Sequence, residues 1–141
     1  LNTCEEGLGN SNGCRYIVEQ YKNRIKSFIS FDGYLNQCTN SAVGSKRYRL
    51  TVHCQGGHSY ADFGKENAIE TLSKIMYELS HQQIPTEAKT TYNFGKIEGG
   101  TTINAIASTA TLLYEYRSSM QNCLDIMEKQ FQEIVSHYSR N

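Results

Sequence analysis

From residue 46 onward, apolar and polar residues follow two different periods in turn. Between residues 46 and 54 they alternate, which predicts a half-buried β-strand. The apolar positions of this strand are Tyr48, Leu50, Val52 and Cys54. Apolar residues then recur every three or four positions and form one stripe of an amphipathic helix. The residues of that stripe are Ala68, Ile69, Leu72, Ile75, Met76 and Leu79.

The second half of the chain predicts a hairpin followed by another helix. Two β-prone segments, 90–98 and 103–117, are joined at Gly99-Gly100, where either glycine can take a positive φ. Ser118 with Gln121 three residues later has the spacing of a capping box, which predicts a helix start. The apolar face of that helix consists of Met120, Cys123, Leu124, Met127, Phe131, Ile134, Val135 and Tyr138.

The order of these elements is strand, helix, strand, strand, helix. It matches the ferredoxin-like βαββαβ plan without its final strand. We therefore predict an α+β fold in two layers, with an antiparallel sheet and two helices on one of its faces.

Residues 1–45 predict a separate unit. A turn-rich opening leads into a short amphipathic helix over 16–24 and a β-prone run over 25–31. A polar linker follows from residue 36, so we place the domain boundary between residues 45 and 46. The chain begins at Leu1 without an initiator Met and stops directly after the second predicted helix. We expect both ends to be cut from a longer protein.

Composition and charge exclude several classes of protein. The chain has 14 basic and 14 acidic residues, so no basic surplus points to nucleic acid or to an anionic membrane. No apolar run approaches the roughly 20 residues that a membrane span needs. The five cysteines are scattered and odd in number, which argues against a disulfide framework and against a zinc finger. This pattern favours a reducing, cytoplasmic location.

Acidic residues near the start of the chain are the first candidates for chemistry. Glu5 and Glu6 are adjacent in a loop, so one carboxylate can bind a metal while the other acts as a base. Asp32 follows the β-prone run and precedes a glycine. Each also has an ordinary interpretation, because glutamate pairs are common on solvated surfaces and Asp commonly begins turns.

The predicted sheet carries three further candidates. His58 follows Gly56-Gly57 in a loop, where its imidazole N–H can be offered to a substrate oxygen. Asn104 and Arg117 flank the last strand, and together they can bind a substrate carboxylate. A solvated or capping role is the alternative for each. The remaining histidines are assigned to a strand face, a helix end and a helix surface: His53, His81 and His137.

Five segments resemble, in order and spacing, the M20 family of metallopeptidases, which includes peptidase T, carboxypeptidase G2 and aminoacylase relatives. The first two, in the N-terminal part, resemble segments of the catalytic domain of that family. The other three resemble the strands and loops of its lid domain. The segments are Asn2–Gly9, Phe31–Gly33, Tyr48–Ile69, Asn93–Asn104 and Tyr114–Arg117.

The resemblance implies a role for each candidate residue. Glu5 would be the general base, and Glu6 and Asp32 would each bind one of two zinc ions. His58 would reach into the active site of a partner subunit in a homodimer and stabilise the tetrahedral intermediate. Asn104 and Arg117 would hold the substrate, a small peptide or an N-acyl amino acid, whose amide bond is hydrolysed.

The sequence lacks the family's other metal ligands. A zinc site needs about four ligands, or three and a water, so we expect the chain alone to be inactive and to serve as the lid and dimerisation domain of its parent enzyme. We expect an edge strand and the helix bearing Ala68, Leu72 and Ile75 to form the dimer. The alternative is a free-standing ferredoxin-like binding or oligomerisation module without catalysis. Glu5, Glu6 and Asp32 favour the first interpretation.

Overall fold

The computed structural model describes residues 11–31, 36 and 41–139. The chain divides into two units, Leu1–Thr39 and Asn40–Asn141, called here the N-terminal and the C-terminal unit. We describe each unit by itself.

Helix α1, Asn12–Tyr21, is the regular element of the described part of the N-terminal unit. It lies further toward the N-terminus than the predicted helix over 16–24. The strand predicted over residues 25–31 is wrong, because this segment has no strand structure. Its β-prone side chains Phe28, Ile29 and Phe31 are exposed. A strand needs a hydrogen-bonded neighbour, and the described residues give this segment none.

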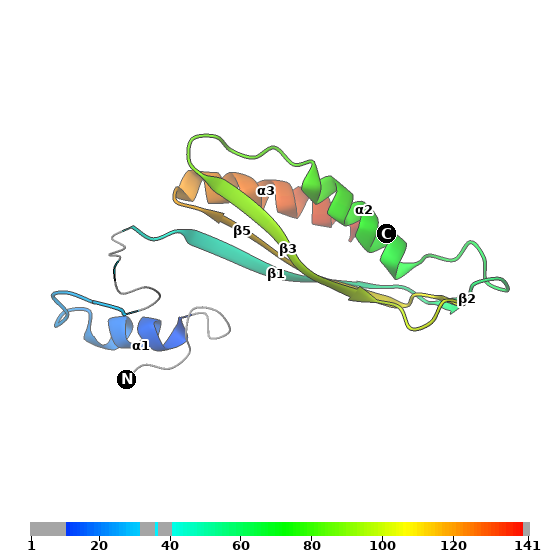
Figure 1. Ribbon diagram of the computed structural model, residues 1–141, viewed down its shortest axis with the longest axis horizontal. Helices are drawn as coiled ribbons and strands as arrows, with labels where there is room; N and C mark the ends of the chain where they lie inside the picture. Colours follow the sequence, from blue (N-terminus) through cyan, green and yellow to red (C-terminus); the bar gives the residue numbers. More distant parts are fainter. Residues whose placement is uncertain (1–10, 32–35, 37–40, 140–141) are drawn as a thin grey trace. The chain divides into compact units, whose positions relative to one another are not determined.

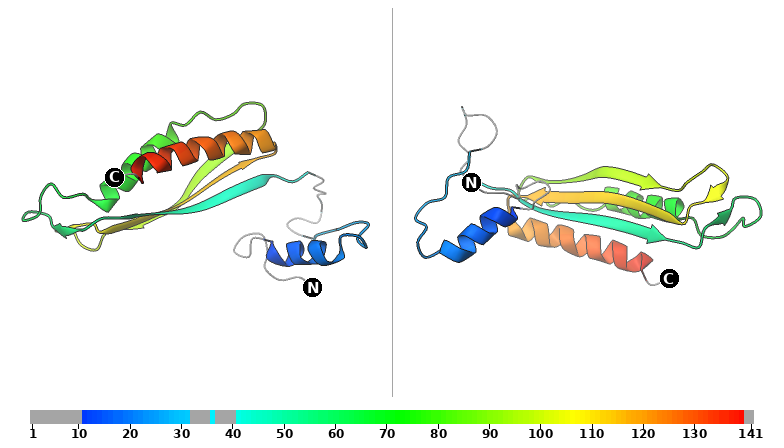
Figure 2. Two further views of the ribbon diagram at one scale, coloured as in Figure 1. Left: turned by 180° about the vertical axis from the view of Figure 1, so that it is seen from behind. Right: turned by 90° about the horizontal axis from the view of Figure 1, so that it is seen from below.

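The C-terminal unit is a two-layer α+β sandwich, which confirms the predicted fold class (Figure 1). Its main sheet is antiparallel with the strand order β1-β5-β3, and helices α2 and α3 cover one face of it (Figure 2). A second sheet of two short strands, β2 and β4, lies at one end. The strands are β1 Gly44–His53, β2 Gly57–His58, β3 Thr90–Gly99, β4 Ala105–Ile106 and β5 Thr109–Ser118. The helices are α2 Ala68–Ser80 and α3 Gln121–Tyr138.

β5 is the central strand. It pairs with β1 from Gly44↔Ser118 to His53↔Thr109, and with β3 on its other side. The long strand predicted over 103–117 is wrong in one respect, because it is divided into β4 and β5. β4 pairs with β2 instead of continuing the ladder with β3. No strand follows α3 among the described residues. In the main sheet that these residues form, β1 and β3 are therefore both edge strands.

The core lies between the sheet and the two helices. Alternate residues of β5 face the helices and are fully buried, among them Leu112, Tyr114 and Tyr116. Leu72 of α2 and Met127 of α3 pack against them without exposure to solvent. Burying side chains of this size stabilises the fold by about 1.5–3 kcal/mol each. None of the helices in the described part of the chain is long and apolar enough to cross a membrane.

A β-bulge interrupts β3 between Phe94 and Lys96. Phe94 pairs with Tyr114 and Ile97 pairs with Leu112, and both partners lie on the helix-facing side of β5. The extra residue, Gly95, therefore allows two apolar side chains an odd number of positions apart to occupy the same face of the sheet.

The two helices begin in different ways. Asn67 caps α2, since its Oδ1 accepts a hydrogen bond from the Ile69 N–H at 3.0 Å. The capping box predicted at Ser118 is wrong, because Ser118 is the last, buried residue of β5. Its hydroxyl accepts hydrogen bonds from Thr90 Oγ1 and from the Met120 N–H. Because Ser118 is packed as part of β5, it does not serve as the N-cap of α3.

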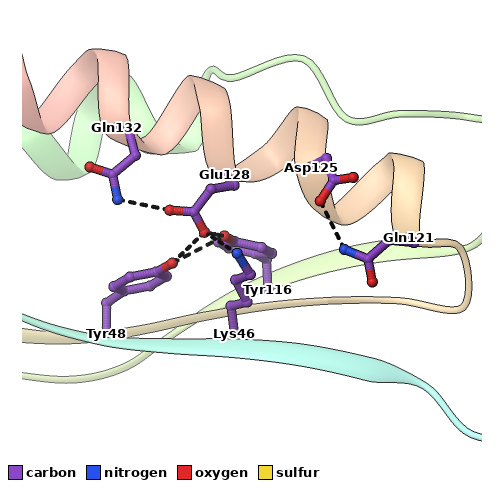
Figure 3. A network of polar contacts seen from close by, with 7 residues as sticks. All are labelled: Lys46, Tyr48, Tyr116, Gln121, Asp125, Glu128 and Gln132. Carbon is purple, nitrogen blue, oxygen red and sulfur yellow. Dashed lines mark hydrogen bonds and ion pairs between the residues drawn. The ribbon is translucent and has the colours of Figure 1, made fainter.

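Glu128 of α3 gathers a polar network against β1 and β5 (Figure 3). Its Oε2 accepts hydrogen bonds from Tyr48 and Tyr116 at 2.5 Å each and from Lys46 Nζ at 2.7 Å. Burial alone would raise the pKa of Glu128, but the donors from Lys46, Tyr116 and Tyr48 outweigh burial and lower it to about 2. Burial raises the pKa values of Tyr48 and Tyr116, and their hydrogen bonds to the Glu128 carboxylate raise them further.

This network predicts an acid-dependent contribution to stability. Because the pKa of Glu128 is about 2 in the folded chain against an ordinary 4.5, its contribution is complete above pH 4.5 and is lost as the pH falls toward 2. At about 1.4 kcal/mol per pKa unit, this shift limits the contribution to at most about 3.5 kcal/mol. Glu128→Gln should remove this part of the pH dependence, measured by urea unfolding followed by circular dichroism.

Glu133→Gln is the matched control on the same helix. Glu133 is 65% exposed and its contact with Lys129 is 4.0 Å long. This variant should keep the wild-type pH dependence of the free energy of unfolding. The assignment is contradicted if Glu128→Gln and the wild-type chain lose the same stability between pH 4.5 and pH 2.

Candidate functional site

The end of the C-terminal unit that carries β2 and β4 is here called the tip, residues 54–66 and 100–108. The Gly100 N–H joins the tip to the main sheet by donating to the Thr109 carbonyl of β5 at 3.1 Å, and within the tip the Cys54 N–H donates to the Ser108 carbonyl at 2.8 Å. Gly56, with a φ of 74°, turns the chain there. A Cβ on Gly56 would lie 3.0 Å from the Ser108 Cβ and 3.2 Å from the Ile106 oxygen. Glycine is therefore required where β1 turns into β2.

His58 stands at the start of a tight turn in the tip, and its side chain is exposed. Its Nδ1 lies 3.3 Å from the backbone nitrogens of Tyr60 and Ala61, which both donate to it. The His58 N–H donates to Asp62 Oδ2 at 2.8 Å, and the Asp62 N–H donates to the His58 carbonyl at 2.9 Å. The hydrogen bond from Lys65, followed by that from the His58 backbone, lowers the pKa of Asp62.

Asn104 lies beside His58, as the register of the small sheet requires. His58 pairs with Ala105, and the Ser59 N–H donates to the Asn104 carbonyl at 3.0 Å. The Asn104 Oδ1 accepts a hydrogen bond from Thr102 Oγ1 at 2.5 Å, which orients the exposed amide. The structure thus brings together two of the predicted site residues, one in β2 and one directly before β4.

Exposed apolar side chains surround this pair. Tyr60 and Phe63 are 90% and 91% exposed, and Ile103 is fully exposed. Phe63 and Ile103 also line one surface hollow of the tip. A group of apolar side chains this exposed to solvent is typical of a surface that binds another protein or a ligand.

Arg117 lies at the opposite end of β5, on the sheet face that the helices do not cover. Its Nε and Nη2 donate to Glu115 at 3.0 Å and 3.1 Å, and Arg47 Nε donates to the same carboxylate at 3.3 Å. The hydrogen bond from Arg117 is the main cause that lowers the pKa of Glu115. Arg117 is therefore held by two hydrogen bonds to one carboxylate and remains exposed.

The structure does not bring Asn104 and Arg117 together within one chain. At about 3.4 Å per residue, the strand from Thr109 to Arg117 spans roughly 27 Å. A small carboxylate cannot contact both residues of the same chain. Their joint role in binding a substrate stays a prediction, and it requires residues from more than one chain.

The acidic candidates of the N-terminal unit, Glu5, Glu6 and Asp32, lie outside the described residues. Within the described ranges, no three His, Cys, Asp or Glu side chains are grouped as a metal site would require. Of the predicted site, the described part of the chain therefore contains the tip residues and Arg117. The metal ligands stay a prediction.

The sequence analysis missed Asp62, which closes the turn that holds His58. The spacing His58-x-x-x-Asp62, with Lys65 three residues further on, is the signal that was available. The other histidines lie away from the tip turn. His81 Nδ1 is 2.8 Å from the Tyr77 carbonyl, His53 Nδ1 is 3.4 Å from Thr109 Oγ1, and His137 is exposed on α3.

Several solved structures share this fold. An aminobenzoyl-glutamate utilization protein from Klebsiella pneumoniae is similar over 67% of this chain, with 17% identity and a TM-score of 0.63. An amidase of the hydantoinase/carbamoylase family from Burkholderia phymatum is similar over 70%, with 17% identity and a TM-score of 0.63. A tripeptidase from Staphylococcus aureus is similar over 65%, with 21% identity and a TM-score of 0.55.

The matched part is 24%, 26% and 24% of those three proteins, so the chain spans about a quarter of their length. A comparison with curated proteins by sequence gave no significant match. The model of the peptidase dimerisation domain of M20 peptidases matches residues 40–141, which are the whole C-terminal unit. The chain therefore belongs to the M20 peptidase family through its dimerisation domain.

Proposed function

We propose that the C-terminal unit is the lid and dimerisation domain of an M20-type zinc peptidase or deacylase, in which His58 of one subunit completes the active site of the other. The substrate is a small peptide or an N-acyl amino acid, and the reaction is hydrolysis of its amide bond. The observation that carries this proposal is the position of His58 and Asn104 at the tip, a strand length away from Arg117.

A composite site follows from this separation. β1 begins at Gly44, opposite Ser118, so Arg117 lies at the end where the chain enters the domain. The tip lies at the far end. Two domains related by a two-fold axis, with their strands antiparallel, bring the tip of each toward the Arg117 end of the other. Arg117 then binds the substrate carboxylate, and the partner's tip supplies a donor to the carbonyl oxygen.

Zinc enters the proposal through the family resemblance. Glu6 and Asp32 would each bind one ion together with residues of the longer parent, and Glu5 would act as the general base. The described residues form no such cluster. The proposed role of His58 therefore rests on the position of its imidazole N–H, which stabilises negative charge on the substrate oxygen.

We infer that the dimer forms through β3 and the outer face of α2. Among the described residues of the C-terminal unit, large apolar side chains exposed on this side are Ile69, Tyr77 and Ile97. α2 packs on β5 and β1, and its C-terminal end meets β3 where the Tyr92 hydroxyl donates to the Ser80 carbonyl. β3 also offers an open backbone edge. This keeps the expected helix, whose outer face makes the contact, because Ala68, Leu72 and Ile75 of the same helix are buried in their own core.

A cytoplasmic location is part of the proposal. The three cysteines that the structure describes, Cys14, Cys54 and Cys123, are free thiols. Free thiols are typical of proteins in a reducing compartment.

The first prediction concerns the dimer. The chain should sediment as a dimer at concentrations on the order of tens of micromolar. Tyr77→Glu and Ile97→Glu should each weaken the dimer at least about tenfold, because each places a charge in an apolar contact. Lys129→Glu, on the exposed face of α3, is the control and should leave the dissociation constant unchanged. A wild-type chain that is monomeric at these concentrations contradicts the interface.

The second prediction concerns metal. The 141-residue chain should not retain stoichiometric zinc after dialysis against buffer without metal. The resemblance assigns it only Glu6 and Asp32 as ligands, one per ion, which is too few to hold zinc. Metal analysis by mass spectrometry measures this directly. Two zinc ions held per chain would show that the ligand assignment is wrong. A natural gene product of only 141 residues would favour a free-standing module instead.

The third prediction concerns His58 in the complete enzyme. His58→Ala should lower kcat about a hundred- to a thousandfold, as expected for one lost donor to an oxyanion. Zinc content and dimerisation should stay unchanged. Mixing this variant with Glu5→Ala should restore activity up to roughly a quarter of wild type, since half of the dimers are mixed and each has one complete site.

The mixing experiment separates the two possible origins of the donor. If His58 serves its own subunit, no site in a mixed dimer combines an intact Glu5 with an intact His58. A mixture that stays inactive although mixed dimers form therefore contradicts the exchange of His58 between subunits. Subunit exchange is verified with differently tagged variants before the assay.

A further inference from the structure

The turn around His58 determines which of its two ring nitrogens carries the proton. The backbone N–H groups of Tyr60 and Ala61 both lie 3.3 Å from Nδ1. A backbone N–H can only donate, so Nδ1 must accept and cannot carry a proton. The proton of the neutral ring is therefore on Nε2, the nitrogen on the far side of the imidazole.

Asp62 holds the backbone in this arrangement. The His58 N–H donates to Asp62 Oδ2 and the Asp62 N–H donates to the His58 carbonyl, so two reciprocal bonds close the turn. Asp62 Oδ1 pairs with Lys65 Nζ at 2.8 Å. A Cβ on Gly57 would lie 2.7–2.9 Å from the Asp62 side chain, so the glycine before His58 allows the aspartate to approach.

We propose that Asp62 is a positioning residue that closes the turn and fixes the exposed His58 as the neutral Nε2–H tautomer. The tautomer follows from the geometry of the turn alone. Its consequence for catalysis rests on the proposed function, in which Nε2–H is the donor to the substrate oxygen. With the other tautomer, the same nitrogen would present a lone pair to a developing negative charge.

The chain contains its own reference for the opposite tautomer. His81 Nδ1 lies 2.8 Å from the carbonyl oxygen of Tyr77. Ser80 Oγ also lies 2.9 Å from this nitrogen, but it donates its own hydrogen to the Tyr77 carbonyl at 2.7 Å. A carbonyl only accepts, so His81 carries its proton on Nδ1 when neutral. One spectrum of the same sample therefore contains one histidine of each kind.

The test is a long-range 15N–1H correlation spectrum of the imidazole rings at about pH 8, where an ordinary histidine is neutral. His58→Ala and His81→Ala assign the signals. In the wild-type chain, the His58 signals should show a protonated Nε2 and an unprotonated Nδ1, and the His81 signals should show the reverse. A protonated Nδ1 in His58 overturns the proposal.

Variants test the part that Asp62 plays. Asp62→Ala should shift His58 toward the tautomer mixture of a free imidazole, while the His81 signals stay unchanged. Asp62→Asn keeps an oxygen that accepts the His58 N–H and should restore the wild-type pattern. Lys65→Ala, which removes only the ion pair, should also preserve it. An unchanged His58 tautomer in Asp62→Ala shows that Asp62 is not the positioning residue.

In the complete enzyme, Asp62→Ala should lower kcat about tenfold to a hundredfold through the misplaced donor, with KM and dimerisation unchanged. Asp62→Asn should restore most of this loss. If His58→Ala leaves kcat unchanged, the proposed function fails, and the spectrum still decides the tautomer. If His58→Ala is strongly impaired and Asp62→Ala is not, the proposed function stands and the positioning role of Asp62 is refuted.

Discussion

The burial of alternate side chains along β5 is the constraint on which the C-terminal unit depends. β5 is hydrogen-bonded on both sides, and its residues Leu112, Tyr114 and Tyr116 meet both helices. The ring of Phe131 from α3 stacks on Tyr114 with centroids 5.7 Å apart, and also on Tyr48 of β1 at 4.1 Å. A shift of β5 by one residue would turn this apolar row to the open face. The register is therefore set by the core.

The same register determines which functional side chains lie at each end of the domain. The residues of β5 that face away from the helices include Leu113, Glu115 and Arg117, so the guanidinium of Arg117 is kept on the uncovered face. At the other end, the Thr109 carbonyl of β5 anchors the tip by accepting a backbone hydrogen bond from Gly100. The core thus positions two chemically different ends, one carrying Arg117 and one carrying His58, and the second contributes Ala107 to it.

The sequence was sufficient to predict an element wherever burial of one face gives the apolar residues a regular spacing. The alternation from Tyr48 to Cys54 and the helical stripe from Ala68 to Leu79 predicted β1 and α2, because one face of each packs on the core. It failed where a local pattern competes with a tertiary partner. Residues 25–31 have the composition of a strand but no neighbouring strand among the described residues, and Ser118 has the spacing of a cap but is buried at a strand end. Asp62 was missed because its bond to the His58 backbone leaves no periodic signal.

The bulge at Gly95 constrains the symmetry of any pairing through β3. When two copies of one strand pair antiparallel, the dyad passes through the middle of the ladder they share. The irregular backbone between Phe94 and Lys96 divides the outer edge of β3 into two short straight runs. The dyad then lies within one run, and each choice fixes a different lateral offset between the two sheets. One inserted residue in an edge strand thus sets how far each subunit extends across its neighbour.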